Sequence, residues 1–109
     1  MWYQETSKRT LNHDYSDITP EQIELLTLTA GACGEVGELY NKLKKGIIHK
    51  HGYDVQEVAE EIGDVLWYLT GLATKLGLDL DDIMLYNVDK LKKRYPEGFD
   101  TDKSKNRVD

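Results

Sequence analysis

The chain lacks several features that would assign it to a particular class of protein. It has one cysteine among 109 residues, so no disulfide can form within the chain and a reducing compartment is expected. It has no apolar run of about 18 residues and no segment with the pattern of a signal peptide. No stretch alternates as a strand does, and no internal repeat is present. We therefore expect a cytoplasmic, helical protein with no membrane partner.

Positive charge is also scarce. Fourteen lysines and arginines against twenty acids give a net charge of −6, which disfavours nonspecific attraction to nucleic acid. We expect no nucleic-acid partner. An acidic protein that binds a polyphosphate needs bridging cations and a few well-placed basic residues. The composition, 39% hydrophobic and 31% charged, is that of an ordinary globular domain.

The length and the helix signals together predict one all-α domain over residues 1–109. We expect a compact helical bundle, with residues 1–18 as an arm or short helix and residues 97–109 as a polar tail. A helical chain this short buries a limited core on its own, so a homodimer or homotetramer is expected.

Three helix starts stand out. Thr19 can cap a helix that has Pro20 at its first position and Gln22 as the partner of a capping box, running to about residue 45. A second capping box, Asp54 with Glu57, opens a helix that ends near residue 76. A similar signal at Asp79 opens a third helix, which ends near residue 95 before a proline.

Two acidic pairs lie where these helices should present core residues. Glu35 and Glu38 in the first helix, and Glu61 and Asp64 in the second, each have i, i+3 spacing, which puts both side chains on one helix face. One member of each pair falls on an apolar stripe: Leu25, Leu28, Ala32, Glu35 and Leu39 in the first helix; Val58, Glu61, Val65, Tyr68 and Leu72 in the second.

Burying unpaired carboxylates is costly, and clustered carboxylates repel one another. A bound divalent cation removes both penalties, and Mg²⁺ prefers oxygen ligands and commonly serves phosphate chemistry. The alternative is a slight rotation of the helices that leaves the acids in solvent. Three glycines around the first pair, Gly31, Gly34 and Gly37, indicate close approach of another helix or of a ligand.

The segments that carry the two acidic pairs resemble those of a known family. GEVGEL (34–39) and EEIGDVLWYL (60–69) are similar to the Glu-x-x-Glu and Glu-x-x-Asp signature of the MazG-like nucleoside triphosphate pyrophosphohydrolases, in the all-α NTP pyrophosphatase superfamily. NVDKLKKRYPEGF (87–99) is similar to a stretch of the small, single-domain members. The resemblance covers nearly the whole chain.

The resemblance implies hydrolysis of an NTP or dNTP to the monophosphate and pyrophosphate, with a role in removing unwanted nucleotides. It implies that Glu35, Glu38, Glu61 and Asp64 are the catalytic Mg²⁺ ligands, with Mn²⁺ as a possible substitute.

The resemblance also suggests residues for the substrate. It implies that Asn87 and Lys90 lie near the phosphates, with Arg94 one turn further on the same helix face. Spacing alone would favour an ordinary solvated face for these three residues. Trp67 and Tyr68 follow Asp64 closely and are candidates for stacking on the nucleobase, although core packing explains them equally well.

Two other functions fit the same acidic pairs. A di-metal carboxylate bundle protein also uses acids from facing helices, but such sites need Glu-x-x-His pairs, and both pairs here are purely acidic. The other is a non-catalytic helical interaction module whose acids are simply solvated. Specific Mg²⁺ binding would separate the enzyme from the module.

Overall fold

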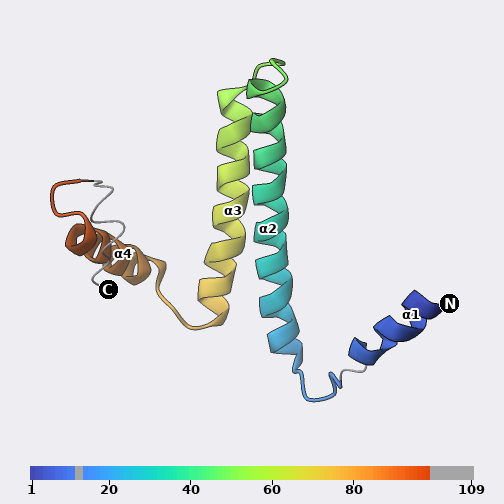
Figure 1. Ribbon diagram of the computed structural model, residues 1–109. Coiled ribbons are helices and arrows are strands. Elements are labelled where there is room, and N and C mark those ends of the chain that lie inside the picture. Colours follow the sequence, from blue (N-terminus) through green and yellow to red (C-terminus); the bar gives the residue numbers. More distant parts are fainter. Residues whose placement is uncertain (12–13, 99–109) are drawn as a thin grey trace.

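The computed structural model describes residues 1–11 and 14–98 as helices joined by short loops (Figure 1). Helix α1 spans Trp2–Ser7 and continues into a 3-10 turn, η1, at Lys8–Thr10; α2 spans Pro20–Ile47, α3 spans Val55–Lys75 and α4 spans Leu80–Arg94. The described residues form no strand, which confirms the all-α prediction. None of the described helices is long and apolar enough to cross a membrane. Residues 99–109 of the expected polar tail lie outside the described residues.

The helices begin where the sequence signals place them. Thr19 Oγ1 accepts a hydrogen bond from the Gln22 N–H (3.1 Å) while the Thr19 N–H donates to Gln22 Oε1 (3.0 Å), which confirms the first capping box. Asp54 caps α3, but its carboxylate accepts from the Gln56 N–H rather than from residue 57. Asp79 caps α4 in the same way, because its carboxylate accepts a hydrogen bond from the Asp81 N–H. A short aspartate side chain therefore reaches the second N–H of each helix.

Helices α2 and α3 form an antiparallel hairpin, and their predicted stripes face each other (Figure 1). Every residue of both stripes is at least half-buried, so the predicted helix faces are confirmed. Gly31 permits the close approach, because a Cβ there would lie 2.4 Å from Cε1 of Tyr68. At Gly34 and Gly37 a Cβ would meet nothing within 4 Å, so no helix among the described residues approaches these two glycines closely.

The expected compact bundle is wrong for the single chain. Its Cα radius of gyration is 19.9 Å, whereas a compact chain of this length has about 13 Å. Helix α4 stands apart from the hairpin (Figure 1), and among the described residues only Ala32 and Ala73 are buried apolar side chains. Periodicity predicts which face of a helix is apolar but not what covers that face, so α4 could be predicted as a helix and still not be placed.

Candidate metal centre

The middle of the hairpin brings together carboxylates from both helices. One carboxylate oxygen from each of Glu35, Glu38 and Glu61 lies within 4.8 Å of the others. Glu61 is only 7% exposed, Glu35 is half-buried and Glu38 is exposed. The cluster therefore has a buried floor on α3 and an open side at Glu38, through which a solute could enter.

Lys42 forms the protein's own ion pair with this cluster. Its Nζ donates to Oε1 of Glu61 at 2.8 Å. This contact, which joins α2 to α3, lowers the pKa of Glu61 and raises that of Lys42. The other Glu61 oxygen, Oε2, is buried and accepts no hydrogen bond from an ammonium, amide or hydroxyl group of the described residues. Glu61 thus has one oxygen held in place and one buried oxygen without a fixed donor.

Glu35 differs from Glu61 in its protonation. The pKa of Glu35 is raised to about 6. The largest cause is a hydrogen bond from its protonated carboxyl group to Glu61, followed by desolvation and by the charges of neighbouring carboxylates. Without a cation, the cluster therefore relieves part of its repulsion by keeping a proton on Glu35 in mildly acidic solution.

The residues present fit a hard divalent cation. Their donors are carboxylate oxygens alone, which suit Mg²⁺ or Mn²⁺. One carboxylate oxygen from each of the three residues lies within 4.8 Å of the others, so all three could hold the same cation. A cation would give the buried Oε2 of Glu61 a fixed partner and would take the place of the proton that Glu35 shares with Glu61.

Asp64, the fourth predicted ligand, lies beside this cluster. Its charge contributes to the raised pKa of Glu35, so the two carboxylates are near each other. Its oxygens are not among those within the 4.8 Å set. The structure therefore gathers three of the four predicted ligands and places the fourth at the edge.

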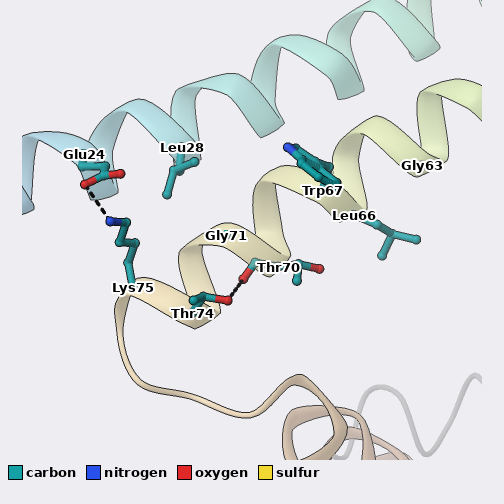
Figure 2. A pocket seen from close by; sticks show the side chains of 9 residues that line it. All are labelled: Glu24, Leu28, Gly63, Leu66, Trp67, Thr70, Gly71, Thr74 and Lys75. Atoms are coloured by element: carbon teal, nitrogen blue, oxygen red, sulfur yellow. Dashed lines mark hydrogen bonds and ion pairs between the residues drawn. The ribbon is translucent and has the colours of Figure 1, made fainter.

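The predicted substrate residues are distributed differently. Trp67 is 79% exposed and borders a groove along the hairpin (Figure 2), so its ring is free to stack on another group. Tyr68 packs between α2 and α3 against Gly31, which is the core role that the sequence left open. Asn87, Lys90 and Arg94 lie on α4, away from the carboxylates, and the single chain does not bring them to the cluster (Figure 1).

Lys42 is a member of the site that was not predicted from the sequence. Lys42 follows Glu38 by four residues and Glu35 by seven, so all three share one face of α2. That spacing was the available signal, but cations near the end of a helix are also expected from the helix macrodipole. The contact with Glu61 on α3 shows that Lys42 belongs to the carboxylate cluster.

Comparisons with known proteins identify relatives of this chain. The chain is 39% identical over 75 residues to the gene 37 protein of Mycobacterium phage L5, covering 65% of this chain and 66% of that protein. It is 36% identical over 75 residues to human dCTP pyrophosphatase 1, covering 66% of this chain and 44% of that protein. The match thus spans just under two thirds and less than half of these two relatives. No solved structure gives a significant match. The model of the MazG nucleotide pyrophosphohydrolase domain matches residues 23–99, well over half of the sequence, and the chain therefore belongs to this family.

Proposed function

We propose that this protein hydrolyses nucleoside triphosphates, ribo or deoxy, to the monophosphate and pyrophosphate in a Mg²⁺-dependent reaction, with Mn²⁺ as a substitute. The observation that carries the proposal is the cluster of Glu35, Glu38 and Glu61, built from two helices around one buried carboxylate. Family membership supports the same reaction class. The human relative is named as a dCTP pyrophosphatase, which places dCTP among the first substrates to test.

Within this proposal, the bound cation would polarise the phosphoryl oxygens and neutralise charge on the departing pyrophosphate. The chain's own residues would hold the cation and orient the carboxylates around it. The 2.8 Å hydrogen bond from Lys42 holds the Glu61 carboxylate in place beside the other two acids. Glu35, whose pKa is raised to about 6 by its hydrogen bond to Glu61, by desolvation and by the neighbouring carboxylates, would hold the cation in its deprotonated form. Asp64 at the edge of the cluster completes the ligand set.

The remaining assignments extend the proposal to the substrate. Asn87, Lys90 and Arg94 would contact the phosphates once α4 approaches a carboxylate cluster, and the exposed Trp67 would stack on the base, with Tyr68 supporting the hairpin behind it. We also propose that the protein is a homodimer or homotetramer that removes noncanonical or surplus nucleotides.

Pyrophosphate release from a panel of NTPs and dNTPs, with Mg²⁺ or with EDTA, tests the reaction. We expect metal-dependent release with the monophosphate as co-product. Inorganic phosphate as the product would mean that a different bond is cleaved. A folded protein that hydrolyses no nucleotide would contradict the proposal and favour an interaction module.

A pair of variants tests the site itself. Glu38→Gln should lower turnover by about 100-fold or more, because losing even an outer-shell partner of a metal costs about 10–100-fold. Glu60→Gln is the matched control: it removes the same charge one residue before Glu61, from an exposed position outside the cluster. Circular dichroism checks that both variants keep their helices. Equal activity in the two variants would exclude Glu38 as a ligand.

A further inference from the structure

A small hollow lies at the end of the hairpin where the chain passes from α2 into α3 (Figure 1). It has a volume of about 190 Å³. Helix α2 contributes the side chains of Lys42 and Lys45, and α3 contributes Glu57 and Val58. Residues 52–54 of the connector complete the lining. We call this feature the lysine hollow.

The connector between the two helices gives the lysine hollow a fixed wall. The Gly52 N–H donates to Gly46 O at 3.1 Å. The preceding N–H, that of His51, donates to Lys45 O at 3.3 Å, so the connector folds back onto the end of α2. Gly46 is buried there, and a Cβ on it would lie 2.7 Å from Gly52 O. Backbone hydrogen bonds therefore shape the hollow, which does not depend on long side chains alone.

Positive charge collects at this end of the hairpin. Residues 39–53 contain four lysines and no acid, in a chain whose net charge is −6. Among the described residues, no carboxylate forms an ion pair with Lys45. The Lys42 ammonium donates one N–H to Glu61 and has two more to give, because an ammonium group carries three donors. The hollow thus offers positively charged hydrogen-bond donors to an anion.

Two acids also line the lysine hollow and restrict which anion it can hold. Asp54 accepts the Gln56 N–H at 2.8 Å as the cap of α3, and Glu57 is exposed. Their two charges formally cancel those of Lys42 and Lys45. A bare polyphosphate would meet repulsion as well as attraction, whereas phosphates that carry a bound Mg²⁺ bring a cation for the carboxylates. The lining therefore favours a magnesium-bound polyphosphate over a free one.

The lysine hollow lies next to the carboxylate cluster. Lys42 belongs to both, since it lines the hollow and donates to Glu61. Glu57 precedes Glu61 by four residues, about 6 Å along α3. Trp67 lies on the other side of the cluster, six residues or about 9 Å beyond Glu61. Along α3 the order is an exposed aromatic ring, the carboxylates and the lysine hollow.

This order matches the order of the parts of a nucleoside triphosphate. With the base on Trp67 and the α-phosphate at the carboxylate cluster, the β- and γ-phosphates extend away from the base by one helical turn, about 5.4 Å, which brings them to the hollow. We infer that the lysine hollow binds the β- and γ-phosphates of the substrate with their Mg²⁺, an inference that rests on the proposed function. Lys45 is then a specificity-determining residue, because a monophosphate of the same base leaves the hollow empty.

Binding of inorganic pyrophosphate in the presence of Mg²⁺ tests the hollow without requiring turnover. In calorimetry, Lys45→Gln should weaken pyrophosphate binding by about tenfold or more, because a charge-assisted hydrogen bond is lost. Lys45→Arg should retain most of the affinity. Lys44→Gln is the matched control: it removes the same charge one residue earlier, but the Lys44 ammonium lies over the Tyr40 ring, so its affinity should equal that of the original protein. Circular dichroism checks that all three variants keep their helices.

A second probe tests the preference for triphosphates. A dCTP analogue with a methylene group between the α- and β-phosphates cannot be cleaved there, so its binding is measurable with Mg²⁺ present. Lys45→Gln should weaken binding of this analogue by a similar factor and leave the affinity for dCMP unchanged. Equal losses for the analogue and for dCMP would overturn the inference, because Lys45 would then act on the nucleoside and not on the terminal phosphates.

The exposed acid of the hollow gives an independent readout. Glu57→Gln removes a carboxylate beside the lysines, so free pyrophosphate in EDTA should bind this variant more tightly than it binds the original protein. Glu60→Gln removes the same charge from an exposed residue outside the hollow and should not change this affinity. An equal gain in both variants would reflect the net charge of the chain and would contradict a site at the hollow.

The hollow and the proposed reaction can fail separately. Pyrophosphate binding that is equally strong in Lys45→Gln and Lys44→Gln would overturn the inference. A protein that hydrolyses no nucleotide but binds pyrophosphate through Lys45 would support the hollow and contradict the reaction. A protein that hydrolyses its preferred nucleotide with the same KM in Lys45→Gln and Lys44→Gln would support the reaction and contradict the hollow.

Discussion

The two oxygens of Glu61 have different environments. One accepts a hydrogen bond from Lys42, and the other is buried without a fixed donor. A buried acceptor without a partner is costly, and its position between helices that also bring Glu35 and Glu38 to the same place makes a cation the partner that fits. The burial of Glu61, which is only 7% exposed, separates this cluster from ordinary helix-surface carboxylates.

The first residue-scale prediction concerns protons released on metal binding. The pKa of Glu35 is raised to about 6 in the metal-free protein, so at pH 6 about half of the molecules carry a proton there that a cation must displace. Mg²⁺ affinity should fall as pH drops through 6, with release of about half a proton per site at pH 6 and almost none at pH 8. Calorimetry in two buffers of different ionisation enthalpy measures this release.

Glu35→Gln is the control for this experiment. The glutamine cannot titrate, so proton release near pH 6 should disappear even where weak metal binding persists. The raised pKa of Glu35 also affects stability. Between pH 4.5 and 6 the folded metal-free chain binds more protons at this group than the unfolded chain does, so its contribution to the free energy of unfolding falls as pH rises through that window. Undiminished proton release in Glu35→Gln would assign the titration to another group.

The second residue-scale prediction concerns Lys42. Lys42→Met removes the cation that lowers the pKa of Glu61, so the metal-free variant should be less stable than the original protein at pH 7. Because the pKa of Glu61 is lowered in the folded chain, its contribution to stability is present above its ordinary pKa and is lost as pH falls. The difference in free energy of unfolding between Lys42→Met and the original protein should therefore decrease in acid. Added Mg²⁺ should raise the melting temperature more in Lys42→Met than in the original protein, because it replaces the missing cation.

Lys44→Met is the matched control for the Lys42 experiment. It removes one charge near the same end of α2, but the Lys44 ammonium lies over the Tyr40 ring rather than on Glu61. If both variants lost the same free energy of unfolding relative to the original protein at all pH values, the 2.8 Å contact of Lys42 with Glu61 would not contribute specifically to stability.

At the scale of the elements, the hairpin depends on how closely α2 and α3 approach. Gly31→Ala would place a Cβ 2.4 Å from the Tyr68 ring, so the ring or the helix must shift. We expect a loss of about 1–3 kcal/mol in the free energy of unfolding, as for overpacking elsewhere. Denaturant titration measures it.

Gly37→Ala provides the contrast in the same helix. A Cβ there meets nothing within 4 Å, so the substitution should gain up to about 1 kcal/mol from helix propensity. If Gly31→Ala were also stabilising, the hairpin would be looser at Tyr68 than the structure shows.

Sequence predicts what is local in these elements. The capping residues and the two stripes, including Glu35 and Glu61 within them, follow from spacing of three and four residues and are found as expected. The Lys42 contact and the placement of Tyr68 depend on which residue of α3 lies opposite α2. That register is a property of two helices together, and neither helix encodes it alone.

At the scale of the whole molecule, the position of α4 could not be predicted from local sequence patterns. Its helical span and caps agree with prediction, yet its separation from the hairpin makes the chain extended instead of compact. The described residues leave large apolar side chains exposed on an otherwise well-formed hairpin, which is the pattern expected for the proposed homo-oligomer.

The stability of such an assembly depends on protein concentration. If folding and association of two chains are coupled, a tenfold rise in concentration is worth about 1.4 kcal/mol per dimer, or about 3–6 °C in melting temperature for chains of this size. Calorimetric scans from micromolar to hundreds of micromolar protein should show this rise, with repeat scans establishing reversibility. A monomeric protein of similar length serves as the control. A melting temperature independent of concentration would mean that the hairpin is stable alone, which its few buried apolar side chains make difficult to explain.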